Sequence, residues 1–134
     1  MRPTVYDTSG TKTYTPPACT VALKVCLWGA GGAGGGANAN PADGGGGGGG
    51  AYSESALTIT PNQSHTIRVA SGGAASATSD PANPGGDTTF ATTIIVAKGG
   101  TGGGVNPAIG AGGSAGGQAS AGTGDVKFSG GSGG

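Results

Sequence analysis

The chain has 134 residues, of which 34 are glycine, and six basic residues balance six acidic ones to give a formal net charge of zero. The basic residues are scattered singly, which argues against a nucleic-acid partner, and no stretch approaches the roughly 20 apolar residues of a membrane-spanning helix. This length allows one domain with a modest core, over residues 1–134, and the charge-poor surface favours assembly into a larger particle.

The N-terminal residues, Met1 to Tyr6, lack the apolar segment of a secretory signal peptide. We therefore expect the chain to be made in the cytoplasm. An extracellular role would then require release by cell lysis or a dedicated export apparatus.

The first predicted strand covers residues 21–28. Its apolar residues recur at period two, which places them together on the core-facing side; they are Val21, Leu23, Val25 and Leu27. Lys24 falls on the opposite side, so the pattern is that of a strand with one buried face.

Two cysteines, Cys19 and Cys26, flank most of this strand. Seven extended residues separate them by roughly 23 Å, whereas a disulfide needs Cα atoms within about 7 Å of each other. We expect two buried free thiols. An intermolecular bridge and an intramolecular bridge are the alternatives.

Glycine-rich blocks interrupt the strands throughout the chain, at residues 29–36, 44–50, 99–104, 110–117 and 130–134. Each glycine costs about 1 kcal/mol in an α-helix relative to alanine and offers a sheet no side chain to pack. The alternatives are a flexible tether and a polyproline-II-like helix with three residues per turn. Because the apolar residues are bunched into strands between the blocks, we favour ordered helices that bond laterally to one another.

One glycine block contains the pattern G-x-G-x-x-G, at residues 29–34. In a dinucleotide-binding protein this motif opens a helix whose N-terminus faces the pyrophosphate. Here further glycines, Asn38, Asn40 and Pro41 follow, and these residues cannot begin a stable helix. We therefore predict no nucleotide and no other cofactor.

Further strands are predicted over residues 51–60, 66–70, 89–98 and 125–128. In the first of these, alternation places Tyr52 and Glu54 on one face and Ser53 on the other. Proline-rich turns separate the tracts, and no segment has helical periodicity of useful length. An all-β framework follows.

The tract 89–98 is predicted as one continuous strand. Phe90, Ile94 and Val96 share one parity there, so we expect all three on the same face.

Residues suited to catalysis or metal binding are few. His65 is the single histidine, with no second histidine or cysteine nearby, so we predict no metal site and expect His65 at the surface or on an edge strand. Glu54 is the only glutamate, and its pairing with an aspartate stays open. No nucleophile, base and orienting residue fall in a recognisable arrangement, and we predict no enzyme activity. Aromatic residues near strand ends pack at the core rim or offer a sugar-stacking surface; they are Tyr6, Tyr14, Trp28 and Tyr52.

Several sequence motifs follow one another in a characteristic order. They are Tyr-Asp-Thr-Ser-Gly-Thr-Lys-Thr-Tyr at 6–14, Val-Cys-Leu-Trp-Gly-Ala-Gly-Gly at 25–32, the glycine run 44–50 with Ala-Tyr-Ser-Glu at 51–54, and Gly-Asp-Val-Lys-Phe-Ser-Gly-Gly at 124–131. This order resembles the glycine-rich domain of many bacteriophage tail-fibre and tail-tip proteins. The resemblance implies a β-sandwich-like framework whose glycine runs pack as polyglycine II helices.

The chain departs from that family pattern in two places. After Val69 the family usually continues into a turn led by Val-Gly, whereas this chain has a Ser-, Thr- and Pro-rich insertion through Pro84. It also ends at Gly134 within a glycine run. Either the polypeptide is longer than this sequence, or a neighbouring subunit completes the run.

The resemblance implies a non-enzymatic structural protein of the bacteriophage virion: a tail fibre, tail tip or surface decoration. We expect a homo-oligomer that assembles with other virion proteins through sheet edges and glycine runs. Two polar loops, 38–43 and 78–87, are candidates for contact with host surface glycans, with Asn38, Asn40, Asp43, Asp80, Asn83 and Asp87 as the candidate residues. The alternative is a cellular or secreted glycine-rich filament protein; a glycan-cleaving enzyme is disfavoured by the scarcity of carboxylates.

Overall fold

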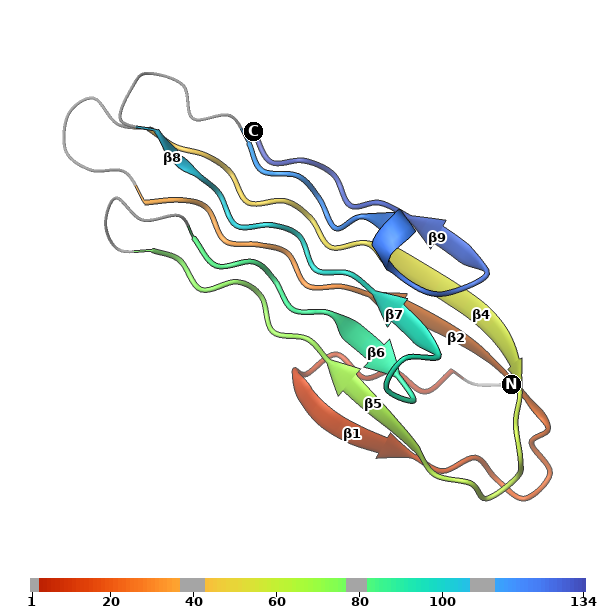
Figure 1. The fold of residues 1–134 in the computed structure, drawn as a ribbon. Coiled ribbons are helices and arrows are strands. Elements are labelled where there is room, and N and C mark those ends of the chain that lie inside the picture. Colours follow the sequence, from red (N-terminus) through yellow and green to blue (C-terminus); the bar gives the residue numbers. More distant parts are fainter. Residues whose placement is uncertain (1–2, 37–42, 77–81, 107–112) are drawn as a thin grey trace.

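The computed structural model describes residues 3–36, 43–76, 82–106 and 113–134. Within these residues the chain forms antiparallel sheets and a short 3₁₀ turn, η1 (Ala119–Ala121) (Figure 1). The first sheet has the order β1 (Gly10–Tyr14), β5 (His65–Val69), β6 (Thr88–Phe90), β7 (Ile95–Ala97). The second has the order β2 (Ala22–Trp28), β4 (Tyr52–Thr58), β9 (Val126–Phe128), and β3 (Asp43–Gly44) pairs with β8 (Val105–Asn106).

The two larger sheets pack face to face over a small apolar core, so the prediction of an all-β, sandwich-like framework is confirmed. The buried cluster consists of Leu27, Ile67, Phe90, Ile95 and Ala97. Leu23 and Val25 pack against it from β2, which confirms the core-facing side predicted for this strand. Val21 lies just before β2 and is 63% exposed, so its predicted place on the core-facing side is wrong.

Small polar side chains also face the core from β4. Ser53 is fully buried, and its hydroxyl donates a hydrogen bond of 2.8 Å to the carbonyl of Val96. Ser55 is buried as well, and its oxygen accepts a hydrogen bond of 3.0 Å from the N–H of Asp125. Because buried hydroxyls are stabilised when they are paired, these bonds fix β4 against its neighbours.

The tract 89–98 is a hairpin, so the prediction of one continuous strand is wrong. β6 and β7 pair with each other, and the turn between them holds Ala91 and Thr92 at φ values of 46° and 66°. Left-handed backbone is uncommon in residues other than glycine, asparagine and aspartate, so the sequence carried no turn signal here. The reversal changes the parity: Ile94 is 53% exposed, while Ile95 is fully buried opposite Phe90.

β1 was not among the predicted strands because its sequence, Gly-Thr-Lys-Thr-Tyr, has almost no apolar alternation. It lies at the edge of the first sheet and pairs with β5, from Gly10 opposite Val69 to Tyr14 opposite His65. Such an edge strand needs little burial of its own, because the ladder of backbone hydrogen bonds holds it in place.

Both cysteines are free, in line with their sequence spacing. The expectation that both thiols are buried is wrong, because Cys19 is exposed before β2 and Cys26 is only half-buried on it. Cys26 points away from the core, since its neighbour Leu27 points inward.

The glycine blocks are ordered as extended helices that exchange backbone hydrogen bonds at every third residue. Gly29, Gly32 and Gly35 donate in turn to the antiparallel segment 45–51, with N···O distances of 2.8–2.9 Å. Three residues is the repeat of a polyglycine II helix, in which every third N–H points the same way. The prediction that the glycine runs pack as such helices is confirmed.

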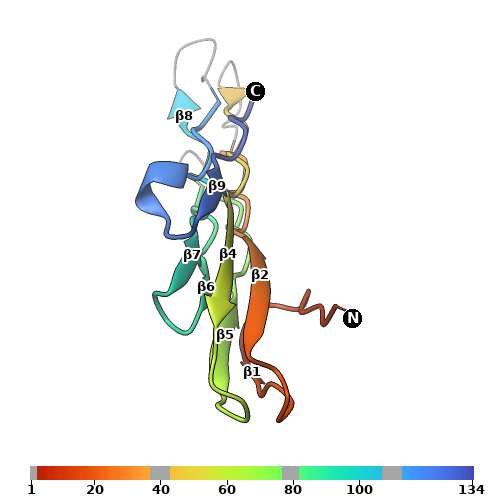
Figure 2. The same cartoon turned by 90° about the vertical axis from the view of Figure 1, so that its right-hand side faces the viewer.

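These helices form a slab of two layers that continues the sandwich (Figures 1 and 2). Hydrogen bonds within and between the layers connect each helix to its neighbours. Layer 1 contains the segments 71–74, 29–36, 44–51 and 130–134, and layer 2 contains the segments 82–86, 98–104 and 113–117. The segments of layer 1 extend β5, β2, β4 and β9. In layer 2, segment 82–86 precedes β6 and segment 98–104 follows β7.

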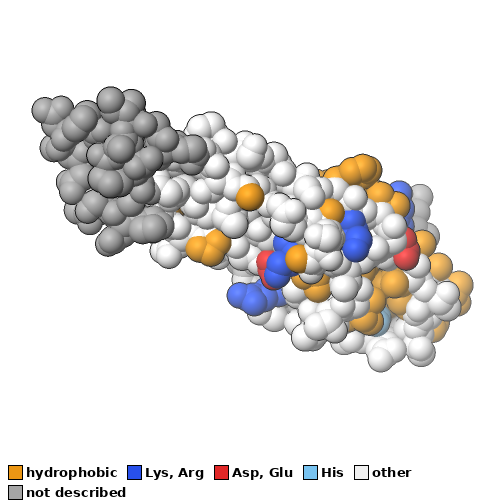
Figure 3. Space-filling model, turned by 45° about the horizontal axis from the view of Figure 1, so that its top comes forward, with side chains coloured by type: hydrophobic (Ala, Val, Ile, Leu, Met, Phe, Trp, Pro, Cys, Tyr) orange, Lys and Arg blue, Asp and Glu red, His pale blue; other side chains and the backbone are white. Residues whose placement is uncertain are grey.

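The slab requires glycine because its backbones are in direct contact. A Cβ at Gly48 would lie 2.0 Å from the carbonyl oxygen of Ala115, and a Cβ at Gly50 would lie 1.9 Å from that of Gly29. Coloured side chains therefore gather over the sandwich in Figure 3, while the slab shows mostly white surface. No helix among the described residues has the length and apolarity to cross a membrane.

Candidate binding surface

The outward side chains of β2, β4 and β9 form one continuous surface, which we call the aromatic face. Leu27 and Ser53 point into the core, so their neighbours along each strand point outward. The aromatic face consists of Lys24, Cys26, Trp28, Tyr52, Glu54, Val126 and Phe128.

Three rings form a row across the aromatic face. The register places Tyr52 between Trp28 and Phe128, with ring centroids 5.1 Å and 6.1 Å away. Trp28 is 65% exposed and Phe128 is 63% exposed. Large exposed aromatic side chains that gather in this way mark surfaces that contact a partner or ligand.

A polar group lies beside the ring row. The carboxylate of Glu54 accepts hydrogen bonds from the hydroxyl of Tyr52 and from the thiol of Cys26, the latter at 3.4 Å. Lys24 completes the group, with its Nζ 2.9 Å from Oε1 of Glu54. The aromatic face therefore offers ring faces together with hydrogen-bond donors and acceptors.

The contacts within this group shift its titration. The hydroxyl of Tyr52 and the ammonium group of Lys24 hold the pKa of Glu54 below its ordinary value of 4.5. The thiol of Cys26 and the carboxylate of Glu54 raise the pKa of Tyr52, and Glu54 raises that of Lys24. At neutral pH Lys24 and Glu54 thus form an ion pair beside the protonated phenol of Tyr52.

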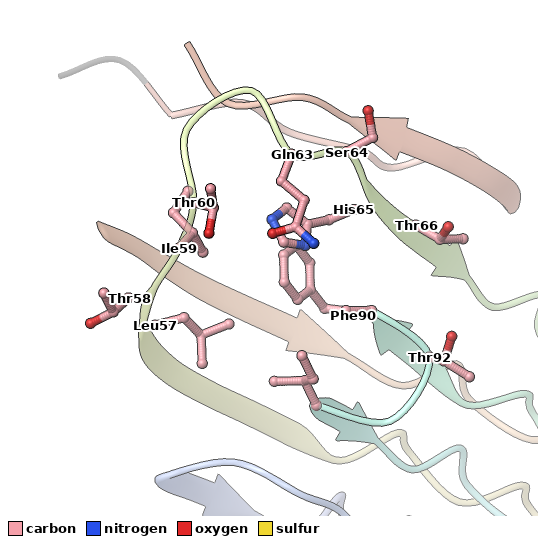
Figure 4. A pocket seen from close by; sticks show the side chains of 12 residues that line it. Leu57, Thr58, Ile59, Thr60, Gln63, Ser64, His65, Thr66, Phe90 and Thr92 are labelled. Atoms are coloured by element: carbon pink, nitrogen blue, oxygen red, sulfur yellow. The ribbon is translucent and has the colours of Figure 1, made fainter. Parts of the chain in front are cut away.

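A cleft of about 550 Å³ opens at the end of the sandwich that lies away from the slab (Figure 4). His65 lines it, stacked on Phe90 at 5.2 Å between centroids, and the buried Nε2 of His65 has no hydrogen-bond partner. His65 is half-buried at the start of β5, which β1 covers, so the expectation of a surface or edge-strand histidine is wrong. Apart from His65, the lining residues are apolar or carry hydroxyl and amide groups.

The loop residues singled out from the sequence divide into two groups. Asn38, Asn40 and Asp80 lie outside the described residues. Asp43 begins β3, where its backbone pairs with Asn106. The segments that flank 37–42, 77–81 and 107–112 all end at the same end of the slab, remote from the sandwich (Figure 1). The receptor-facing role of these loop residues stays a prediction.

The remaining two loop residues have defined contacts. Asn83 is an exposed residue of layer 2, and its carbonyl accepts a hydrogen bond of 3.2 Å from the N–H of Ala33. Asp87 forms a salt bridge with Lys98 and accepts a hydrogen bond of 2.9 Å from the N–H of Gly99. Burial alone would raise the pKa of Asp87, but Lys98 and the Gly99 N–H outweigh it and hold that pKa below its ordinary 3.8.

Among the described residues, no group of three or more His, Cys, Asp or Glu side chains is placed to hold a metal ion. Sequence alternation correctly paired Tyr52 with Glu54, but it could not identify Phe128 as their neighbour. That pairing depends on the register between β4 and β9, which are far apart in the chain. Tyr6 and Tyr14 pack against the core, so they are the rim aromatics, whereas Trp28 belongs to the exposed row.

Comparison with known proteins places this architecture in a family. The family model of the glycine-rich domain matches residues 7–134, which is nearly the whole chain. A search among curated proteins finds no match. The sandwich and the polyglycine slab described above are both inside the matched range, and the chain belongs to the glycine-rich domain family.

Proposed function

We propose that this chain is a non-enzymatic structural protein of a bacteriophage virion, in a tail fibre, tail tip or surface decoration. In this role it assembles with further copies and with other virion proteins, and it contacts glycans on the host surface. The resemblance of its strand and glycine order to tail-fibre domains supports the virion assignment. The polyglycine slab is the observation that carries the structural role.

The slab suits a thin, stiff appendage because its interior consists of backbone. Successive helices are joined by N–H···O=C bonds of 2.7–3.2 Å. Hydroxyl groups of Thr101 and Ser114 add bonds to backbone carbonyls between segments 98–104 and 113–117. Each helix therefore supports its neighbours laterally, in the way that strands support one another in a sheet.

The outer surface of layer 1 supports assembly between copies. The N–H groups of Gly31, Gly34, Gly47 and Gly50 have no hydrogen-bond partner among the described residues. Gly31 and Gly34 are three residues apart, as are Gly47 and Gly50, so these donors repeat at about 9 Å along each helix. The same spacing connects layers 1 and 2, and a second polyglycine surface would match it.

Immunogold electron microscopy tests the virion assignment directly. An antibody against this chain is applied to lysates and to intact cells of the source. We expect gold on particle tails or capsid surfaces, which would also separate a fibre from a decoration protein.

The rival function is a cellular or secreted filament protein built on the same packing. It predicts gold along cell-attached filaments with none on particles, and that result would overturn the virion assignment. Purified protein also separates the two, because a filament protein polymerises without limit whereas a virion component forms closed oligomers or waits for its partner.

A further inference from the structure

The aromatic face combines two kinds of group that one class of ligand requires together. Trp28 and Phe128 present largely exposed rings, and Tyr52 joins them into a row three strands wide. A pyranose has an apolar face of C–H groups that stacks on such rings, and a rim of hydroxyl groups that exchange hydrogen bonds. Neighbouring ring centroids lie 5.1 Å and 6.1 Å apart, with interplanar angles of 56° and 28°, so the rings provide a twisted series of platforms for the neighbouring sugars of one chain.

The polar group beside the row supplies the hydrogen-bonding half of this recognition. The side chain of Lys24 is 67% exposed and that of Glu54 is 22% exposed, so solvent or a ligand reaches both. Lys24 donates and Glu54 accepts, which matches hydroxyl groups that do both. The contacts to Tyr52 and Cys26 hold the Glu54 carboxylate in place before any ligand arrives.

The charge and the shape of the aromatic face restrict the class of saccharide further. The Lys24–Glu54 pair is neutral as a unit, so it favours an uncharged saccharide over an acidic one. The surface is an open sheet face rather than a cavity, which suits a chain that lies across several rings. Equatorially linked pyranoses, such as β-1,4-linked glucose, present a C–H face at each sugar along such a chain.

We propose that the aromatic face binds a neutral, β-linked polysaccharide chain, with Trp28, Tyr52 and Phe128 as stacking platforms and Lys24 and Glu54 as hydrogen-bonding partners. This inference rests on the proposed contact with host glycans, and it names the surface and the saccharide class. Several copies in one particle would multiply a weak single contact into useful avidity.

Intrinsic fluorescence tests the proposal, because Trp28 is the single tryptophan of the chain and lies in the proposed site. The full chain is titrated with cellohexaose, with glucose and dextran as comparison sugars. We expect a saturable change in Trp28 emission with cellohexaose and little change with either comparison sugar. Loss of one stacking ring in Phe128→Ala should weaken binding about fivefold.

Two further variants separate binding from folding. Val21→Ala removes an exposed apolar side chain outside the aromatic face, so its affinity should equal that of the parent chain. Glu54→Gln keeps the shape of the side chain but breaks the ion pair, and we expect weaker binding there with an unchanged circular dichroism spectrum.

Three outcomes would overturn the proposal. The first is an emission that does not respond to cellohexaose at millimolar concentrations, and the second is equal weakening in Phe128→Ala and Val21→Ala. The third is a change in Trp28 emission when the protein is diluted without sugar, provided that Phe128→Ala abolishes this change. In that case a second copy of the chain, and not a saccharide, would cover the ring row. Gold labelling of particles alongside any of these results would leave the virion assignment intact.

Discussion

The sandwich is packed by side chains, whereas the slab is packed by backbone. In the sandwich, side chains fill the space between sheets: Phe90 is 2% exposed and Ile95 is fully buried. In the slab, the space between helices is too small for any side chain, as the 2.0 Å approach of Ala115 to a Cβ at Gly48 indicates. We therefore expect the sandwich to lose stability when side-chain atoms are removed, and the slab to lose stability when side-chain atoms are added.

This difference extends to the free energy of folding. Glycine loses more conformational entropy on folding than any other residue, so a polyglycine helix is unstable by itself. In the slab that cost is offset by hydrogen bonds, each worth about 1 kcal/mol net, to several neighbours at once. Because layers 1 and 2 continue the strands of the sandwich, the side-chain core also fixes where the glycine helices begin and end.

The largest expected effect is that of a methyl group added inside the slab. Gly48→Ala places a Cβ against the carbonyls of layer 2, and we expect a loss of about 3 kcal/mol in the free energy of unfolding. Denaturant unfolding measures it. The matched control is Gly104→Ala, where no atom lies within 4 Å of the new Cβ, and we expect a change under about 1 kcal/mol. Equal losses in the two variants would refute the comparison.

A methyl group removed from the sandwich should cost less. Ile95→Val leaves a small void in the core cluster, and we expect a loss of about 1 kcal/mol in the free energy of unfolding. The exposed neighbour provides the control: Ile94→Val should change stability very little. If Ile95→Val destabilised the chain more than Gly48→Ala, the slab would be the more tolerant region.

The salt bridge between Asp87 and Lys98 lies where β6 and β7 pass into layer 2, so it connects the two regions. Both side chains are 34% exposed, and Asp87→Asn should cost at most about 1 kcal/mol at pH 7. The folded pKa of Asp87 is lowered, so its contribution is present above the ordinary value of 3.8 and is lost as pH falls through the lower folded value. Thermal unfolding of parent and variant should therefore differ at pH 7 and converge once the pH lies below the folded pKa of Asp87. A difference that persists at low pH would point to packing instead of charge.

The smallest expected effect on stability belongs to the aromatic face. Trp28→Ala removes a side chain that is 65% exposed, and we expect a change of about 0.5 kcal/mol in the free energy of unfolding. Chemical denaturation followed by circular dichroism measures it without the lost tryptophan. A much larger loss would mean that Trp28 serves the fold more than ligand binding.

Several strands could be predicted because their alternation is strong. The face of β2 that carries Leu23, Val25 and Leu27 was readable from period two alone, and so was the pairing of Tyr52 with Glu54 on β4. The β6–β7 hairpin was not readable, because its turn uses Ala91 and Thr92 where glycine or asparagine would have signalled a reversal.

The aromatic face likewise could not be predicted as a site from local sequence patterns. Trp28 and Tyr52 were predicted near strand ends, and Phe128 fell in the predicted strand 125–128. Their assembly into a row depends on the registers of β2 with β4 and of β4 with β9. Residues 28 and 128 are neighbours of Tyr52 only through those long-range pairings. Local patterns do not encode them.

The sequence by itself determined that the chain is all-β and that its glycine runs cannot be α-helices, because alternation and the entropy cost of glycine are local properties. Only the tertiary structure decided which glycine helices lie side by side and which side chains share the outer face. Polyglycine segments are nearly identical to one another, so their sequences carry little information about partners. The strands that precede and follow them select those partners, because the side-chain core admits one arrangement of strands.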